Sequence, residues 1–255
     1  MTRRRFIADT WTSTTATLTG DQAAHLARVL RATPGQVYDI VANGFLHRAE
    51  ITEVRTAGNG EDHQVVFTLH EELSSDAALP LHLLLAVFKF DHMEWAIEKA
   101  TELGIARITP ILARRTEKHL AQAALKRAER WRRIALEASK QSRRTGIPEI
   151  ADPIAIKAAL AEEKSPTRIL LSETEQATTL TAALETAPRP TSYEPVALNP
   201  QITHALAIGP EGGWTPEEMS LFTQHQWQPV TLGPRILRAE TAAIAAIAIA
   251  STHLT

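Results

Sequence analysis

The hydrophobic pattern up to about residue 75 is that of short strands. β-branched and aromatic residues gather at 37–41 and 65–69, and the Gly-Asn-Gly at 58–60 is a turn signal between strands. One helix is expected at 22–30, with Asp21 as its N-cap. This part of the chain therefore predicts a small β-rich unit.

The pattern changes after Pro80. Residues 81–87 form a nearly continuous apolar run, which is typical of a strand buried on both faces of a parallel sheet. Apolar residues then recur at helical spacing from Met93 to Leu103 and end at Gly104. The alternation continues, with further strands expected at 108–112, 169–171, 206–208 and 230–232, and further helices at 122–142 and 240–251. We therefore predict an α/β fold with a mostly parallel sheet over 80–255, preceded by a β-rich domain over 1–75.

Composition sets limits on the chemistry. The chain has 255 residues, a formal net charge of −2 and no cysteine, which excludes disulfides, thiolate metal sites and cysteine nucleophiles. The longest apolar stretch, Ala242–Ala250, is too short to cross a bilayer, and the basic N-terminal residues do not lead into a signal peptide. A cytoplasmic protein without a membrane anchor is expected.

Positive charge is concentrated in one segment. Residues 111–150 contain eleven Lys or Arg and four Glu, although the whole chain is slightly acidic. Such a segment favours phosphate binding. The alternative is a helix whose charges are simply solvated.

Two glycine-containing loops follow predicted strands, at 208–214 and 232–242. The first leads into Thr215-Pro-Glu-Glu218, a capping-box pattern that places a helix N-terminus directly after the loop. Loops at the carboxyl ends of parallel strands are where α/β proteins bind ligands. Each loop alone is also compatible with a simple tight turn.

Five segments together resemble a known family, the RsmE-type ribosomal RNA small-subunit methyltransferases of the SPOUT (trefoil-knotted) class. They are Arg4–Ile7, His25–Arg31 with Gly35, Met93–Gly104 with Ile108–Pro110, Gly209–Gly213 and Leu232–Ala242. The resemblance implies a PUA-like barrel that binds RNA, followed by a SPOUT domain with a C-terminal trefoil knot. It also implies S-adenosylmethionine as cofactor, N3-methylation of one uridine in 16S rRNA of the small ribosomal subunit, a homodimer and no metal.

The resemblance assigns roles to individual residues. The expected cofactor-binding residues are Leu171, Ile208, Gly209, Glu211, Gly212, Gly213, Leu232, Gly233, Ile236 and Leu237. The expected RNA-binding residues are Arg4, Arg28, Arg31, Lys89, Arg114, Arg115 and Arg143. Arg238 is the candidate for stabilising negative charge on the uracil, and Glu240 either orients Arg238 or acts as the base.

Two alternatives remain open. One is a SPOUT methyltransferase that modifies another RNA position, such as a ribose 2′-hydroxyl or a guanine. The other is a non-catalytic RNA-binding factor of ribosome assembly whose loops are structural. Donor binding separates enzyme from binder, and analysis of the modified nucleosides separates the two enzymes.

Overall fold

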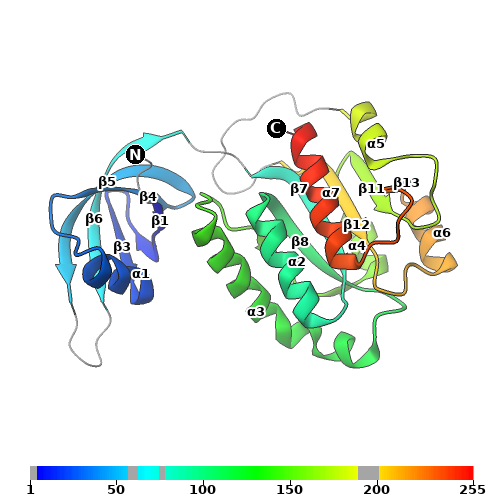
Figure 1. Ribbon diagram of the computed structural model, residues 1–255, viewed down its shortest axis with the longest axis horizontal. Helices are drawn as coiled ribbons and strands as arrows, with labels where there is room; N and C mark the ends of the chain where they lie inside the picture. Colours follow the sequence, from blue (N-terminus) through cyan, green and yellow to red (C-terminus); the bar gives the residue numbers. More distant parts are fainter. Residues whose placement is uncertain (1–4, 57–62, 75–77, 189–200, 255) are drawn as a thin grey trace. The chain divides into compact units, whose positions relative to one another are not determined.

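The computed structural model describes residues 5–56, 63–74, 78–188 and 201–254. They fall into two compact units, shown in Figure 1. The N-terminal unit comprises the chain up to Ala77 together with 143–146, and most of the chain from Ala78 onward forms the C-terminal unit. The predicted turn at 58–60 lies outside the described residues.

The N-terminal unit is built on one curled, six-stranded sheet (Figure 1). Its strands are β1 (Arg5–Ile7), β2 (Thr10–Trp11), β3 (Thr15–Thr19), β4 (Val37–Ala42), β5 (Phe45–Arg55) and β6 (Gln64–Leu73), in the order β1-β4-β5-β6-β3-β2. Of the strand pairs that the structure describes here, β1–β4 is parallel and the others are antiparallel. Leu18, Leu26 and Phe67 are fully buried in its core. In this strand order β1 and β2 are the two edge strands and do not pair with each other, so the described strands do not form a closed barrel.

The helix of this unit differs from its prediction. It begins at Gly20 rather than Gln22, as α1 (Gly20–Ala24), and continues as one π-helical segment, η1 (His25–Val29). Thr19 is the N-cap and makes no side-chain capping bond, so Asp21 lies in the first turn instead. A carboxylate in the first turn still interacts favourably with the helix dipole, which explains why Asp21 marks this end of the helix.

The C-terminal unit contains a seven-stranded sheet in which every pairing is parallel, as the apolar runs predicted. Its strands are β7 (Leu79–Ala86), β8 (Ile105–Leu112), β9 (Glu149–Ile150), β10 (Ile154–Ala155), β11 (Thr167–Leu171), β12 (His204–Ile208) and β13 (Gln228–Val230). The order is β10-β8-β7-β12-β11-β13, and β9 also pairs with β8. All eight residues of β7 are buried, because helices cover both faces of the sheet.

Among the described residues of this unit, six helices form the two outer layers. One face packs against α2 (Phe90–Glu102), α3 (Lys118–Gln141), α5 (Leu180–Thr186) and α7 (Ala239–Leu254), and the other against α4 (Ile156–Glu162) and α6 (Pro216–Gln224). The helices predicted at 93–103, 122–142 and 240–251 correspond to α2, α3 and α7, with ends shifted by a few residues. In the described parts of the chain, no helix combines the length and apolar character needed to span a membrane.

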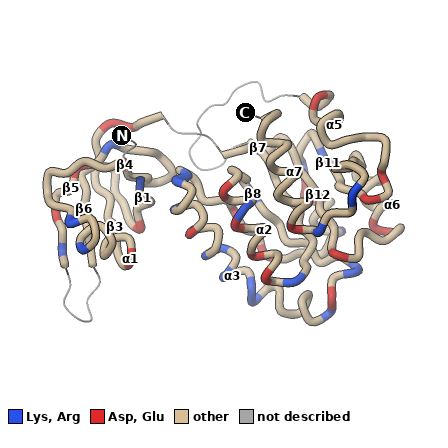
Figure 2. The backbone as a smooth tube through the Cα atoms, viewed as in Figure 1, with Lys and Arg blue, Asp and Glu red and all other residues tan. Residues whose placement is uncertain are grey.

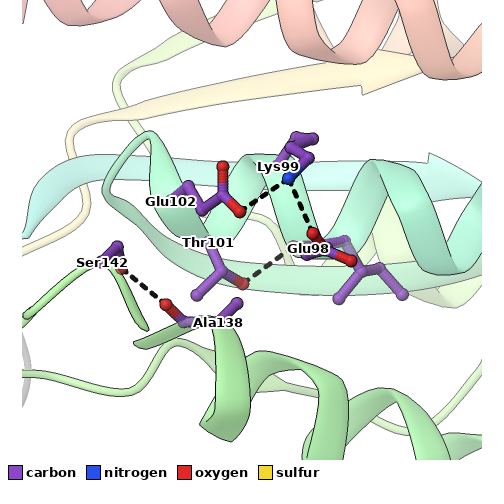
Figure 3. Close-up of polar contacts among 7 residues, drawn as sticks. Glu98, Lys99, Thr101, Glu102, Ala138 and Ser142 are labelled. Carbon is purple, nitrogen blue, oxygen red and sulfur yellow. Dashed lines mark hydrogen bonds and ion pairs between the residues drawn. The ribbon is translucent and has the colours of Figure 1, made fainter. Parts of the chain in front are cut away.

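Helices α2 and α3 lie side by side, and polar groups near their C-terminal ends are satisfied within each helix (Figure 3). The Lys99 ammonium contacts the carboxylates of Glu98 and Glu102 at 2.6 and 2.7 Å. The Ser142 hydroxyl donates to the Ala138 carbonyl at 2.7 Å. Apolar side chains, together with contacts of Arg127 and Arg130 with Glu94, pair the two helices.

Candidate functional site

A cavity of about 970 Å³ lies where β11, β12 and β13 end. Three loops line it, drawn from residues 171–176, 208–214 and 230–239. Lys89 and His92, at the start of α2, line it as well. Carboxyl ends of parallel strands meet at one edge of a sheet, so loops far apart in sequence converge there.

Most of the residues expected to bind a cofactor line this cavity. They are Leu171, Ile208, Gly209, Glu211, Gly213, Leu232, Gly233, Ile236 and Leu237. Gly212 is the exception. A Cβ on Gly212 would lie 3.3 Å from the Arg115 Cδ, so this glycine faces a side chain of the protein rather than the cavity.

The two glycine loops present bare backbone to the cavity. Gly213 and Gly233 have φ angles of +71° and +113°, which residues with a Cβ rarely adopt. A Cβ on Gly213 would also lie 2.7 Å from a carboxylate oxygen of Glu173. At Gly233 no atom lies within 4 Å of the Cβ position, so that space is open. A flat ligand can therefore approach the main chain closely.

Arg115 holds the first loop in place. Its guanidinium donates to the carbonyls of Gly212 and Trp214. The Trp214 indole N–H in turn donates to the Leu171 carbonyl at 3.3 Å, joining the loops that follow β12 and β11. Arg115 was predicted to bind RNA, but in the structure its side chain is engaged with the loop.

The capping box at the start of α6 forms as predicted. The Thr215 hydroxyl accepts from the Glu218 N–H at 3.3 Å, and the Glu218 carboxylate accepts from the Thr215 N–H at 2.8 Å. The other oxygen of buried Glu218 accepts from the Arg114 N–H at 2.7 Å. This carboxylate therefore fixes the basic segment that follows β8 to the helix behind the cavity.

Arg238 and Glu240, at the start of α7, have different surroundings. Arg238 is exposed and lines the cavity, whereas Glu240 is 3% exposed. The expected pair between them is absent from the described ion pairs. Glu240 instead points inward to α2, where its Oε1 lies 3.2 Å from His92 Nδ1. In the described residues Glu240 therefore pairs with His92 rather than with Arg238, and its predicted role in orienting Arg238 stays a prediction.

Much of the positive charge between 111 and 150 is paired. Arg127 and Arg130 both contact Glu94, at 2.7 and 2.9 Å, and burial lowers the pKa of Arg144 to about 10. The solvent-exposed cations of this segment for which the described residues include no ion pair are Arg114, Arg115, Lys118, Lys126, Arg133 and Arg143, and several lie along α3 (Figure 2). Fewer cations of this segment are therefore available to bind phosphate than the count of Lys and Arg indicated.

The other predicted RNA-binding residues are dispersed. Arg28 and Arg31 are exposed on the N-terminal unit, and Arg143 is exposed in the segment that groups with it. Lys89 lies at the cavity, 3.7 Å from a Glu211 carboxylate oxygen. Arg4 lies outside the described residues.

Two elements of the cavity were missed. The loop after β11, Ser172–Gln176, contains no glycine, and its only signal was a polar run directly after an apolar strand. His92 was passed over because a single histidine in a helix is rarely informative. Both belong to the cavity only because distant segments converge on it.

Comparison with known proteins identifies the family. Residues 75–251 match the RNA methyltransferase domain. The chain is 34% identical over 235 residues to the ribosomal RNA small subunit methyltransferase E of a Synechocystis species, covering 92% of this chain and 72% of that protein. It is 28% identical to the protein of the same name from Bacillus subtilis, over 93% of this chain and 90% of that one. A solved ribosomal RNA small subunit methyltransferase E from Neisseria gonorrhoeae, bound to S-adenosyl methionine, superposes with a TM-score of 0.74 at 28% identity, covering 99% of this chain and 98% of that one. The resemblance seen in the motifs is confirmed, and the chain belongs to the RNA methyltransferase family, among the small-subunit methyltransferases of type E.

Proposed function

We propose that this protein uses S-adenosylmethionine to methylate N3 of one uridine in the 16S rRNA of the small ribosomal subunit. The observation that carries the proposal is the cavity at the ends of β11, β12 and β13, where the backbone of two glycine loops is exposed to a ligand. A solved relative with a similar fold binds this donor.

The lining of the cavity suits the donor. Small-molecule sites typically enclose about 300–1,000 Å³, so this cavity offers space at the upper end of that range. Apolar side chains such as Ile208 and Leu237 can cover an adenine ring, and the carboxylates of Glu173 and Glu211 can face the positively charged part of the molecule. When bound, the donor supplies an electrophilic methyl group on a sulfonium.

Arg238 supplies the electrostatic part of the mechanism. Uracil N3 carries a proton, and its loss leaves negative charge that spreads onto the neighbouring oxygens. The Arg238 guanidinium lines the cavity and is engaged in no ion pair of the described residues, so it is available to that charge. A cation held in place before the reaction stabilises developing charge without reorganisation.

The remaining parts of the proposal concern architecture and partners. Residues 1–75 act as a PUA-like RNA-binding domain, and 80–255 form a SPOUT domain with a trefoil knot. The protein works as a cytoplasmic homodimer. The apolar side chain of Trp95 on α2, at 49% exposure, supports a protein contact there.

The decisive experiment combines two measurements. Calorimetry with S-adenosylmethionine should show one donor site per chain, and absence of binding would favour the non-catalytic assembly factor. Purified, unmodified small subunits incubated with protein and donor should then yield 3-methyluridine by mass spectrometry of digested rRNA. A 2′-O-methylated nucleoside or a methylguanosine would instead identify another acceptor.

A further inference from the structure

His92 and Glu240 form a histidine–carboxylate pair at the wall of the cavity. His92 lies in the first turn of α2 and lines the cavity, with its side chain 31% exposed. Glu240 lies in the first turn of α7 and is 4% exposed at its side chain. The 3.2 Å between Nδ1 and Oε1 brings the inner nitrogen of the ring against the carboxylate.

The carboxylate is otherwise unsatisfied. Glu240 Oε2 is buried and has no hydrogen-bond partner among the described residues, and His92 Nδ1 likewise lacks an aligned one. A buried charge without partners is costly, so a proton on Nδ1 is strongly favoured. Pairs of this kind often tighten only when substrate binds.

The position of that proton decides the chemistry of the other nitrogen. In a neutral imidazole, a proton on Nδ1 leaves a lone pair on Nε2. The closest charged group to Nε2 is Asp91 Oδ2, at 3.7 Å, beyond hydrogen-bonding distance and on a side chain that is 77% exposed. Nε2 is therefore available as a proton acceptor.

Building on the proposed function, we propose that His92 accepts the N3 proton of the target uracil and that Glu240 holds the ring and stabilises the imidazolium that results. The proton moves from N3 to Nε2, and its bonding electron pair stays on N3. The N3 pair then forms the bond to the methyl carbon as the carbon–sulfur bond breaks and its electrons pass to sulfur. Because the ring is partly exposed, the proton leaves afterwards to water.

This arrangement gives each residue of the site a separate task. His92 removes the N3 proton of the uracil. Arg238 then stabilises the negative charge that this loss leaves on the uracil oxygens. The charged groups that line the cavity or contact the pair are Lys89, Asp91, Glu173, Glu175, Glu211, Arg235, Arg238 and Glu240. Among them, the Arg238 cation and the imidazole backed by Glu240 are the groups to which we assign the uracil charge and the N3 proton.

The test compares two variants of His92 in single-turnover methylation of small subunits across pH 5 to 9. His92→Asn keeps a donor to Glu240 but has no atom at Nε2, and His92→Lys keeps a cation beside Glu240. Both should lose about 100-fold or more in rate, as expected for loss of a general base. The pH profile of the wild-type rate should differ from that of His92→Asn, which has no nitrogen at the Nε2 position. Donor affinity by calorimetry should stay close to that of wild type, because Nε2 acts on the target base and not on the donor.

A second measurement is made on the free protein. ¹⁵N spectra of histidine-labelled protein, with the His92 signals identified from their absence in His92→Asn, should show a proton on Nδ1, and Glu240→Gln should change that pattern. A His92→Lys variant with the wild-type rate and pH profile would show that the pair is only a structural contact and would overturn the assignment. ¹⁵N spectra that place the His92 proton on Nε2 would overturn it as well. If wild-type protein itself forms no 3-methyluridine, the proposed function fails instead.

Discussion

The most quantitative prediction concerns a buried pair outside the cavity. His82, on β7, places Nδ1 2.5 Å from Glu163 Oε2 and Nε2 2.8 Å from the Thr109 hydroxyl. The backbone N–H of Ser165 donates to the other Glu163 oxygen at 2.7 Å. Burial by itself raises the pKa of Glu163, but the bonds from His82 and Ser165 outweigh it and hold that pKa at about 2.

The size of the effect follows from this pKa. Between the ordinary value of 4.5 and about 2, the ionised carboxylate is favoured in the folded protein by about 3 kcal/mol. A carboxyl group whose pKa is lowered by folding stabilises the protein above its unfolded pKa. That contribution is therefore complete above about pH 4.5 and is lost as the pH falls towards 2.

Replacing Glu163 with Gln removes the charge and keeps the shape. At pH 7 the variant should unfold with a free energy about 3 kcal/mol lower than wild type, and the difference should shrink below pH 4.5. Urea unfolding followed by tryptophan fluorescence suits this test, because only Trp11 of the five tryptophans belongs to the N-terminal unit. The matched control is Glu162→Gln, one residue away and exposed. A Glu163→Gln variant as stable as this control at pH 7 would refute the reasoning.

Four further predictions concern the site and its partners. Gly233→Val should abolish donor binding in calorimetry while the protein stays folded, because Gly233 has a φ of +113° at the cavity; normal binding would make it a turn residue only. Arg238→Lys should lower the single-turnover rate about 100- to 1,000-fold with donor affinity unchanged, and a defect confined to donor affinity would place Arg238 in the cofactor pocket. Replacing the exposed α3 cations with Gln should flatten the salt dependence of RNA binding by about one unit of slope per lost phosphate contact, whereas Arg127→Gln, at a residue already paired with Glu94, should change the slope less. The set to replace is Lys118, Lys126 and Arg133. Light scattering at micromolar concentration should show a dimer, and a monomer would count against the proposed assembly.

The sequence by itself determined the elements that depend on neighbours along the chain. The buried strand β7 was evident from its nearly continuous apolar run, and α2 from its helical spacing and Gly104. The capping box of Thr215 and Glu218 was visible because its two bonds join residues three positions apart. The loops at 208–213 and 232–237 come directly after strands, so the predicted strands were enough to place these loops at the edge of the sheet. The family was recognisable for the same reason, since its motifs are contiguous.

Only the tertiary structure decided which distant residues meet. Arg115 reaches a carbonyl 97 residues away, and His82 contacts a carboxylate 81 residues away. No local pattern distinguishes these side chains from exposed charges or ordinary core residues. The same holds for Glu240, which the sequence placed beside Arg238 and which the helix layer turns towards His92. Propensity and periodicity act over a few residues, whereas the direction of a side chain at a helix start depends on the helix packed against it, and that is fixed only when the sheet brings both helices together.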